Sequence, residues 1–452
     1  MADTIAAIAT GAQVAAIGII RISGPEALPI VDRLFRPASG KLMSEYEDRK
    51  LVYGRLTDLS GDLLDLCLCT VSHAPHSYTG EDTAELQCHG SPTVLRAALE
   101  ELFHAGARQA LPGEFTKRAF LNGRMELSSA EAVADIIDAE SIECAKNAAA
   151  QLSGAVAVKA DNIYSTLTDI SSHYHAVLDY PDEDIEAFRL ENYKQQLGSA
   201  ADSLRALLGS FERGKLMVSG IPAAIVGRPN AGKSSLLNAI LGYDRAIVTD
   251  IPGTTRDTVE EKCVLGGVLL RLIDTAGLRE TEDAVEKLGT ERSRRAAEDA
   301  GLVLALIDGS QPVTPEDEAI LRLAAGKECW ILLLTKADLP QKAILPRLSA
   351  LPGTAPAAVL SLSAKTGSGI PALETAVAEL FPQGEAETGS LLTNPRQADA
   401  VGRALDAVRR AEESLSLGLT PDVILTDAEE ALSALGELTG ATAREEIVSA
   451  IF

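Results

Sequence analysis

Short hydrophobic runs separated by turn residues mark the beginning of the chain. The runs Val14 to Ile22 and Leu63 to Val71 are bounded by turn sequences such as Ser23-Gly24-Pro25 and Leu111-Pro112-Gly113. Apolar runs of this length between glycine and proline residues are typical of strands and short helices. The pattern therefore predicts an α+β unit over residues 1–122.

After residue 122 the hydrophobic positions take on the spacing of helices. Ser128 and Glu131 fit a capping box at a helix start, and a hydrophobic stripe follows at intervals of three and four residues. The same spacing returns after a linker-like segment at 383–395. We expect residues 123–214 and 383–452 to pack together as one all-α helical domain, because neither part buries its stripe alone. The stripe consists of Tyr193, Leu197, Ala200, Leu204, Leu207 and Phe211.

Residues 215–382 alternate between β-rich runs and helical segments. This alternation predicts an α/β domain with a mostly parallel sheet, inserted in the helical domain. Gly266-Gly267 separates two further runs and is a hairpin signal, so we expect one antiparallel strand. The β-rich runs are Ala223 to Val226, Leu302 to Ile307, Ile331 to Leu334 and Ala357 to Leu362.

Length and charge narrow the class of protein. A chain of 452 residues exceeds the size of one hydrophobic core, which supports a multidomain fold. The net charge of −24 argues against broad neutralisation of nucleic-acid phosphates, so RNA contacts must be local or shared with a partner. No run approaches the roughly 18 apolar residues that span a bilayer, and the N-terminus lacks a basic start before an apolar core. We expect a cytoplasmic protein with no membrane segment.

Cysteines and histidines give no metal signature by their spacing. We interpret the thiols as reduced and packed, and His89 and His104 as structural imidazoles. The carboxylates of 179–186 fit either a metal cluster or the positive end of a helix dipole, and the second reading is favoured. The cysteines are Cys67, Cys69, Cys88, Cys144, Cys263 and Cys329.

Gly227 to Ser234 fits the phosphate-loop pattern, directly between an apolar strand and a helix-like segment. In such a loop the backbone amides face phosphate oxygens, Lys233 reaches the β- and γ-phosphates, and the Ser234 hydroxyl ligates Mg²⁺. A chance glycine-rich turn is the alternative. The predicted nucleotide contacts of this loop are Asn230, Ala231, Gly232, Lys233, Ser234 and Ser235.

Two segments after the loop fit the switches of a GTPase. A threonine of the pair Thr254-Thr255 can ligate Mg²⁺, with Thr255 as our choice. Asp274 ends the next strand, where its carboxylate can hold the Mg²⁺ shell while the Gly277 amide meets the γ-phosphate. The predicted contacts are Thr249, Asp250, Ile251, Pro252, Gly253, Thr254 and Thr255, then Asp274, Thr275, Ala276 and Gly277.

Thr335-Lys336-Ala337-Asp338 follows another apolar strand and predicts selection of guanine. The Asp338 carboxylate can accept the guanine N1 and N2 hydrogens, which adenine does not offer. Thr335 stands where this motif usually has Asn, a departure that we expect to weaken at most one contact. Ser363-Ala364-Lys365 would meet the base through a backbone amide. Together these motifs, in this order, indicate a GTPase.

The chain lacks the glutamine that orients water in Ras-like GTPases, since Leu278 follows Gly277. The stretches 227–235, 249–257 and 274–279 resemble the MnmE (TrmE) family of tRNA modification GTPases almost residue for residue. The resemblance implies K⁺ activation, with K⁺ enclosed by Asn230, Thr249, Ile251 and Thr254. From the residues alone, Asn230 is equally well a loop-stabilising amide.

The resemblance also implies a catalytic carboxylate, Glu286, that positions the attacking water. Glu280, Glu282 and Asp283 are rivals nearby, and a solvated helix start would explain the whole cluster. Arg228 and Arg256 are candidate arginine fingers, and we favour K⁺ over both.

Three stretches of residues 1–122 and just beyond resemble the family's folate-binding and dimerisation domain: 18–24, 77–90 and 111–124. The resemblance implies that Glu85 pairs with the pterin donor edge, while Arg21 and Arg124 meet polar groups of a tetrahydrofolate derivative in the 5,10-methylene or 5-formyl form. Without it, these residues would be a structural carboxylate and two surface arginines.

The resemblance further implies a reaction and partners. A homodimer, with an MnmG-type FAD protein, would install a carboxymethylaminomethyl or aminomethyl group at C5 of the tRNA wobble uridine, and GTP hydrolysis would open and close the G domains. The family ordinarily ends in Phe-Cys-x-Gly-Lys, whereas this sequence stops at Phe452. We expect GTP hydrolysis to be independent of that tail. Rival classes are an RNA-binding assembly GTPase and a membrane-linked transport GTPase.

Overall fold

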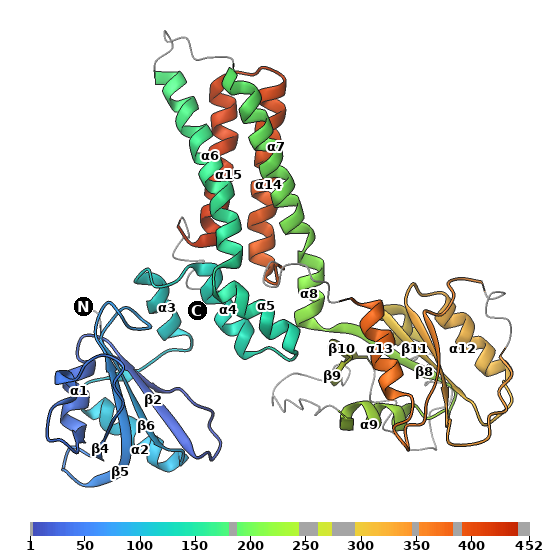
Figure 1. Cartoon of the computed structure of the whole chain (residues 1–452), viewed down its shortest axis with the longest axis horizontal. Helices are drawn as coiled ribbons and strands as arrows, with labels where there is room; N and C mark the ends of the chain where they lie inside the picture. Colours follow the sequence, from blue (N-terminus) through green and yellow to red (C-terminus); the bar gives the residue numbers. More distant parts are fainter. Residues whose placement is uncertain are drawn as a thin grey trace. The chain divides into compact units, whose positions relative to one another are not determined.

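The computed structural model describes residues 3–179, 188–243, 261–273, 294–345, 352–382 and 391–441. The chain divides into two compact units, Met1–Val133 with Gly436–Phe452, and Ala134–Leu435. The first contains a seven-stranded sheet, and the second contains a helical bundle and a six-stranded sheet (Figure 1).

The N-terminal sheet has the strand order β3-β4-β5-β6-β2-β1-β7. Neighbouring strands are antiparallel except β1 and β7, which are parallel. The strands are β1 (Ile5–Ile8), β2 (Ile17–Ser23), β3 (Phe35–Pro37), β4 (Val52–Thr57), β5 (Leu63–Ser72), β6 (Thr83–His89) and β7 (Arg108–Gln109).

Side chains alternate between the two faces of this sheet. Helices α1 (Ala27–Leu34) and α2 (Pro92–His104) pack with one set of strand residues into a single hydrophobic core. On β5 that set includes Cys67, Cys69 and Val71, whereas Thr70 lies on the opposite face because strand side chains alternate. The short η1 (Met43–Glu45) and α3 (Glu114–Leu121) complete this part of the chain.

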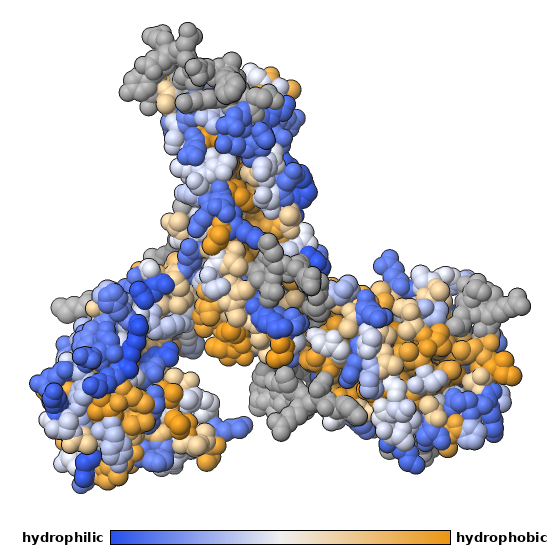
Figure 2. Space-filling model, in the orientation of Figure 1, coloured by the Kyte–Doolittle hydropathy of each residue, from blue (hydrophilic) through white to orange (hydrophobic). Residues whose placement is uncertain are grey.

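Four long helices form a bundle in which segments from both ends of the second unit lie side by side (Figure 1). They are α6 (Ala155–Asp179), α7 (Phe188–Gly209), α14 (Pro395–Ser416) and α15 (Pro421–Thr439). Arg410 of α14 forms an ion pair with Asp427 of α15 at 2.9 Å. Figure 2 shows hydrophilic residues along the visible flanks of the bundle. The shorter helices are α4 (Leu127–Ile137), α5 (Ile142–Leu152) and α8 (Phe211–Ser219).

Helices from the two segments predicted to form one helical domain pack against each other. Most of the stripe is buried, with Leu197 and Leu204 fully inaccessible, and α7 packs along α14. The Ser210 hydroxyl accepts a hydrogen bond from the Leu392 amide at 3.1 Å, which joins the chain before the inserted sheet to the chain after it. Phe211 is the exception, because it begins α8 rather than continuing α7.

The predicted capping box at Ser128 is wrong. Helix α4 begins at Leu127, so Ser128 lies inside the helix rather than at its cap. Its hydroxyl is buried and has no hydrogen-bond partner, which a capping residue would have. The local pattern was overridden by the burial of this helix start, where Ser128, Ser129 and Glu131 are all buried.

The second sheet has the order β13-β12-β11-β8-β10-β9, and only β9 runs antiparallel to its neighbour. Gly266 and Gly267 both have positive φ and join β9 to β10, so the predicted hairpin is confirmed. The strands are β8 (Ile221–Gly227), β9 (Glu261–Leu265), β10 (Val268–Leu272), β11 (Leu302–Asp308), β12 (Trp330–Thr335) and β13 (Ala358–Ser361). The helices beside it include α9 (Lys233–Tyr243), α12 (Pro315–Ala325) and α13 (Ile370–Leu380).

Among the described residues, no helix combines the length and the apolar composition that a membrane span requires.

Candidate functional site

A tight loop connects β8 to α9 at the carboxyl end of the parallel strands. Asn230 (φ 61°) and Gly232 (φ 96°) adopt left-handed backbone conformations, which turn the chain within a few residues. The Lys233 ammonium donates to the carbonyl oxygens of Gly227 and Arg228 at 2.8 and 3.0 Å. Burial lowers the Lys233 pKa. The loop therefore holds the partly buried Lys233 ammonium against its own backbone carbonyls. Phosphates bind at this place in loops of this pattern.

Arg228 is tied to a buried carboxylate. Its Nε lies 3.3 Å from Oδ1 of Asp317, and the Asp317 side chain is fully inaccessible. The same carboxylate caps α12, because its Oδ2 accepts hydrogen bonds from the Thr314 amide and hydroxyl at 2.9 Å. Moving Arg228 to a phosphate would leave a buried carboxylate without its cation, a costly arrangement.

Thr335 connects the guanine motif to the phosphate loop. Its buried hydroxyl donates to the Ala231 carbonyl at 2.7 Å and lies 3.2 Å from that of Ile307. Ala231 is a residue of this loop and is itself buried. A threonine at this position thus holds the loop to the end of β12 through one hydroxyl.

The remaining residues of the guanine motif are held at the carboxyl ends of β11, β12 and β13. The Ser363 hydroxyl donates to Oδ1 of Asp338 at 2.7 Å, and this hydrogen bond lowers the Asp338 pKa. Lys336, with φ of 57°, pairs through Nζ with Asp308 at 2.7 Å. An ionised, oriented Asp338 is suited to accept two hydrogen bonds from one edge of a base.

A cavity of about 390 Å³ lies on the face of the N-terminal sheet that α1 and α2 leave uncovered. Arg21 of β2 and Glu85 of β6 are directly opposite in the sheet, and Arg21 Nε donates to Glu85 Oε1 at 2.8 Å. The Arg21 guanidinium also lies over the rings of Tyr78 and Phe115, at 5.3 and 5.7 Å from their centroids. The residues lining the cavity include Arg21, Arg49, Thr70, Tyr78, Glu85 and Gln87.

Thr70 brings an unused polar group to this cavity. It lies opposite Glu85 on β5, and its hydroxyl oxygen is buried without a hydrogen-bond partner. A buried hydroxyl without a partner is unfavourable, so this position favours a polar ligand.

Sequence comparisons place both regions in one family. Residues 4–124 match the family model described as GTP-binding protein TrmE N-terminus, and residues 127–452 match the MnmE helical domain. The tRNA modification GTPase MnmE of Symbiobacterium thermophilum is 43% identical over 451 residues, which cover 100% of this chain and 98% of the relative. The chain belongs to the MnmE family.

Two further relatives of the same name are covered to the same extent as the first. The proteins of Acetivibrio thermocellus and Roseiflexus sp. are 42% and 43% identical, each over 100% of this chain and 98% of the relative. The G domain of the T. maritima FeoB iron transporter is similar to 36% of this chain and 99% of its own, at 24% identity and a TM-score of 0.26. The predicted MnmE resemblance and fold class are both confirmed, with an α+β N-terminal part, a helical part and a mostly parallel P-loop sheet.

The structure assembles part of the nucleotide site predicted for this MnmE family member. Asn230, Lys233 and Ser234 share the loop, with Ser234 and Ser235 exposed. Thr335 ends β12, and Asp338 follows it in the turn after that strand. The other predicted switch, metal and catalytic residues lie outside the described residues. They are Thr249, Asp250, Ile251, Pro252, Gly253, Thr254, Thr255, Asp274, Thr275, Ala276, Gly277 and Glu286, together with Arg256 and the rivals Glu280, Glu282 and Asp283.

The folate residues implied by the MnmE resemblance are only partly brought together. Arg21 and Glu85 share the cavity, whereas Arg124 donates from Nε to the Ser77 carbonyl at 3.1 Å and is not among the lining residues. Sequence reasoning missed Thr70 and Arg49. Tyr78 and Phe115 stand within the family-like stretches, and their aromatic character was the available signal.

Proposed function

We propose that this chain is a GTP hydrolase that acts in tRNA modification, as the name of its relatives describes. The observation that carries the GTPase part is the hydrogen bond from Thr335 to Ala231. This hydrogen bond links the phosphate-binding loop to the end of β12, where the guanine motif begins, so that one nucleotide can contact both. Asp338, oriented by Ser363, would accept the guanine N1 and N2 hydrogens, and Ala364 and Lys365 would complete the base pocket.

The loop residues fit the expected metal ions. Ser234, exposed at the start of α9, would hold Mg²⁺ with Thr255. Asn230 is exposed in the same loop, with a left-handed backbone, and its side chain offers an amide oxygen as a ligand. With Thr249, Ile251 and Thr254, Asn230 would enclose K⁺. A bound K⁺ supplies positive charge beside the phosphates. This arrangement needs no arginine finger, and Arg228 is held by Asp317.

Potassium dependence is the most direct test of this proposal. GTP hydrolysis should rise sharply in KCl relative to NaCl at equal ionic strength, because the proposed site would bind K⁺ in preference to Na⁺. Turnover is measured by phosphate release under saturating GTP and Mg²⁺. Equal rates in the two salts would remove the K⁺ site, while loss of hydrolysis in both would remove the GTPase assignment.

Glu286 is our proposed catalytic carboxylate. It would orient a water molecule whose oxygen attacks the γ-phosphorus as the bond from that phosphorus to the bridging oxygen breaks, and it would hold the water's proton. Glu286→Ala should lower kcat by about 100-fold and leave the GTP dissociation constant nearly unchanged. Single-turnover hydrolysis and fluorescent-nucleotide titration measure the two quantities. Full activity would pass the role to Glu280, Glu282 or Asp283.

The cavity on the N-terminal sheet supports folate binding. A pterin offers a flat ring to the Tyr78 and Phe115 side of Arg21 and a donor edge to Glu85, and the unsatisfied Thr70 hydroxyl adds a polar contact. A bound tetrahydrofolate derivative, in the 5,10-methylene or 5-formyl form, supplies a one-carbon unit. Arg124 would meet its polar tail beyond the cavity.

The complete activity involves partners. We propose a homodimer that works with an MnmG-type FAD protein to place a carboxymethylaminomethyl or aminomethyl group at C5 of the tRNA wobble uridine. GTP hydrolysis would drive opening and closing of paired G domains. Mass spectrometry of wobble uridines in cells with and without the protein tests this reaction. Unchanged uridines alongside intact GTP hydrolysis would favour an assembly GTPase.

A further inference from the structure

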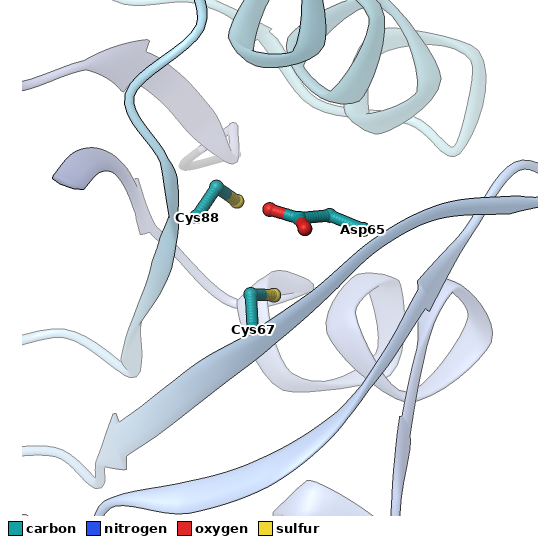
Figure 3. Close-up of side chains that lie close together, drawn as sticks. All are labelled: Asp65, Cys67 and Cys88. Carbon is teal, nitrogen blue, oxygen red and sulfur yellow. The ribbon is translucent and has the colours of Figure 1, made fainter. Parts of the chain in front are cut away.

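Two thiols and a carboxylate meet on the helix-covered side of the N-terminal sheet. Asp65 and Cys67 are alternate residues of β5 and so share a face, and Cys88 stands on the adjoining strand β6. Their ligand atoms all lie within 4.8 Å of one another. Figure 3 shows the three side chains extending toward one another from the two strands.

Hydrophobic packing accounts for the thiols but not for the carboxylate. Cys67 and Cys88 belong to the buried core, where a thiol packs like a small apolar group. The Asp65 side chain is only 9% exposed, and its ion-pair partner among the described residues is the exposed imidazole of His89, at 2.7 Å, rather than a lysine or arginine. A nearly buried carboxylate beside two sulfur atoms is an arrangement that a cation would stabilise.

Hydrogen bonds fix Asp65 and leave it one free coordination position. Oδ1 accepts from the Leu66 amide at 2.7 Å and contacts His89 Nδ1 at 2.7 Å, while Oδ2 accepts from the His89 amide at 2.8 Å. A carboxylate has about four lone-pair positions, so one remains on Oδ2. Metal-ligating carboxylates are oriented by outer hydrogen bonds of this kind.

We propose that Asp65, Cys67 and Cys88 bind a thiophilic divalent cation, with Zn²⁺ as the best match. Two sulfur ligands and one oxygen suit zinc, whereas Mg²⁺, Ca²⁺ and K⁺ take oxygen ligands. Tetrahedral zinc with these bond lengths places its ligand atoms roughly 3.4–3.8 Å apart, within the observed limit. Binding releases the two thiol protons to solvent and needs no oxidant, and water takes the fourth position.

The ion would join β5 to β6 behind the cavity. Thr70 and Glu85 stand on the same two strands but on the opposite face, so the site is separate from the proposed folate contacts. Its expected effect is to stabilise this sheet, because a cation that binds only the folded state raises the unfolding temperature.

Cobalt titration of the full chain tests the site. The protein is reduced, treated with chelator, freed of nucleotide and titrated with Co²⁺ without Mg²⁺. We expect one equivalent to produce near-ultraviolet thiolate-to-cobalt absorption, which oxygen ligands at the nucleotide site do not give. Zn²⁺ should then remove the absorption by displacing Co²⁺, and should raise the unfolding temperature.

Matched variants separate the site from other thiols. Cys67→Ser and Cys88→Ser should lose the absorption and the thermal shift, and Asp65→Asn should bind more weakly. Cys69→Ala, a buried thiol of the same strand, should keep both. If a serine variant unfolds, protection of Cys67 and Cys88 from alkylation by Zn²⁺ in the unaltered protein gives the same answer. Absence of thiolate absorption in the reduced protein, or its persistence in Cys67→Ser and Cys88→Ser, overturns the proposal.

Discussion

The nucleotide site and the cavity of the N-terminal sheet are built in different ways. At the predicted nucleotide site, the functional groups within the described residues come from short contiguous runs at the ends of parallel strands, such as the loop after β8 and the turn after β12. The cavity instead uses the side chains of separate strands, such as Arg21 of β2, Thr70 of β5 and Glu85 of β6, and the side chains next to them in sequence point to the other face.

This difference explains why the nucleotide site could be predicted from sequence motifs, whereas the cavity could not. A loop that binds phosphates with backbone amides constrains several consecutive residues, so it produces a recognisable pattern. A sheet face uses every second residue of strands that are distant in sequence, and this pattern cannot be distinguished from the ordinary alternation of a strand.

Glu85→Gln should have the largest effect on the cavity side of this comparison. It removes the charge that pairs with Arg21 and with a pterin edge, and charged hydrogen bonds contribute about 1.5–3 kcal/mol. We expect folate affinity to fall by roughly 10- to 100-fold, measured by calorimetry. Glu101→Gln, on α2 outside the cavity, should retain affinity. Unchanged affinity in Glu85→Gln would move the folate site elsewhere.

The N-terminal sheet also carries an acid-sensitive ion-pair cluster. Burial opposes ionisation of Glu114, but hydrogen bonds from Arg108, the Leu111 amide and Arg118 outweigh it and lower the Glu114 pKa to about 2. The folded pKa lies below the ordinary value of 4.5, so the stabilisation is complete above about pH 4.5 and is lost toward pH 2.

Glu114→Gln therefore tests how much this cluster stabilises the sheet. The variant should lose about 1–2 kcal/mol of unfolding free energy at pH 7, and the difference from the unaltered chain should shrink as the pH falls below 4.5. Thermal unfolding across that range measures both. A difference independent of pH would show that packing, not charge, is responsible.

Thr335→Val should give the smallest change, on the nucleotide side. It keeps the shape of the side chain but removes the hydrogen bond to Ala231, and such a bond contributes about 0.5–1.5 kcal/mol. We expect GTP affinity to fall by about 2- to 10-fold, with Thr375→Val on α13 as the control. Thr335→Asn should retain GTP affinity if a hydrogen bond to the Ala231 carbonyl is sufficient, because the Asn amide can donate that bond in place of the hydroxyl.

Local sequence signals succeeded where they matched the final packing. The Gly266-Gly267 hairpin and the stripe around Leu197 were both predictable, because a two-glycine turn and a helical spacing have few alternative uses. The capping signal at Ser128 failed, because the residue is buried within α4. Capping depends on where a helix starts, and tertiary burial decided that start.

By itself the sequence determined the G-domain motifs, the parallel sheet that presents them and the family to which the chain belongs. Only the tertiary structure decided that Thr335 tethers the phosphate loop, that Arg228 is held by Asp317 and that Cys67 meets Cys88 beside Asp65. The physical reason is the separation along the sequence between the residues that interact. Backbone-directed loops are encoded in neighbouring residues, whereas side-chain contacts between strands depend on register, which the whole sheet sets.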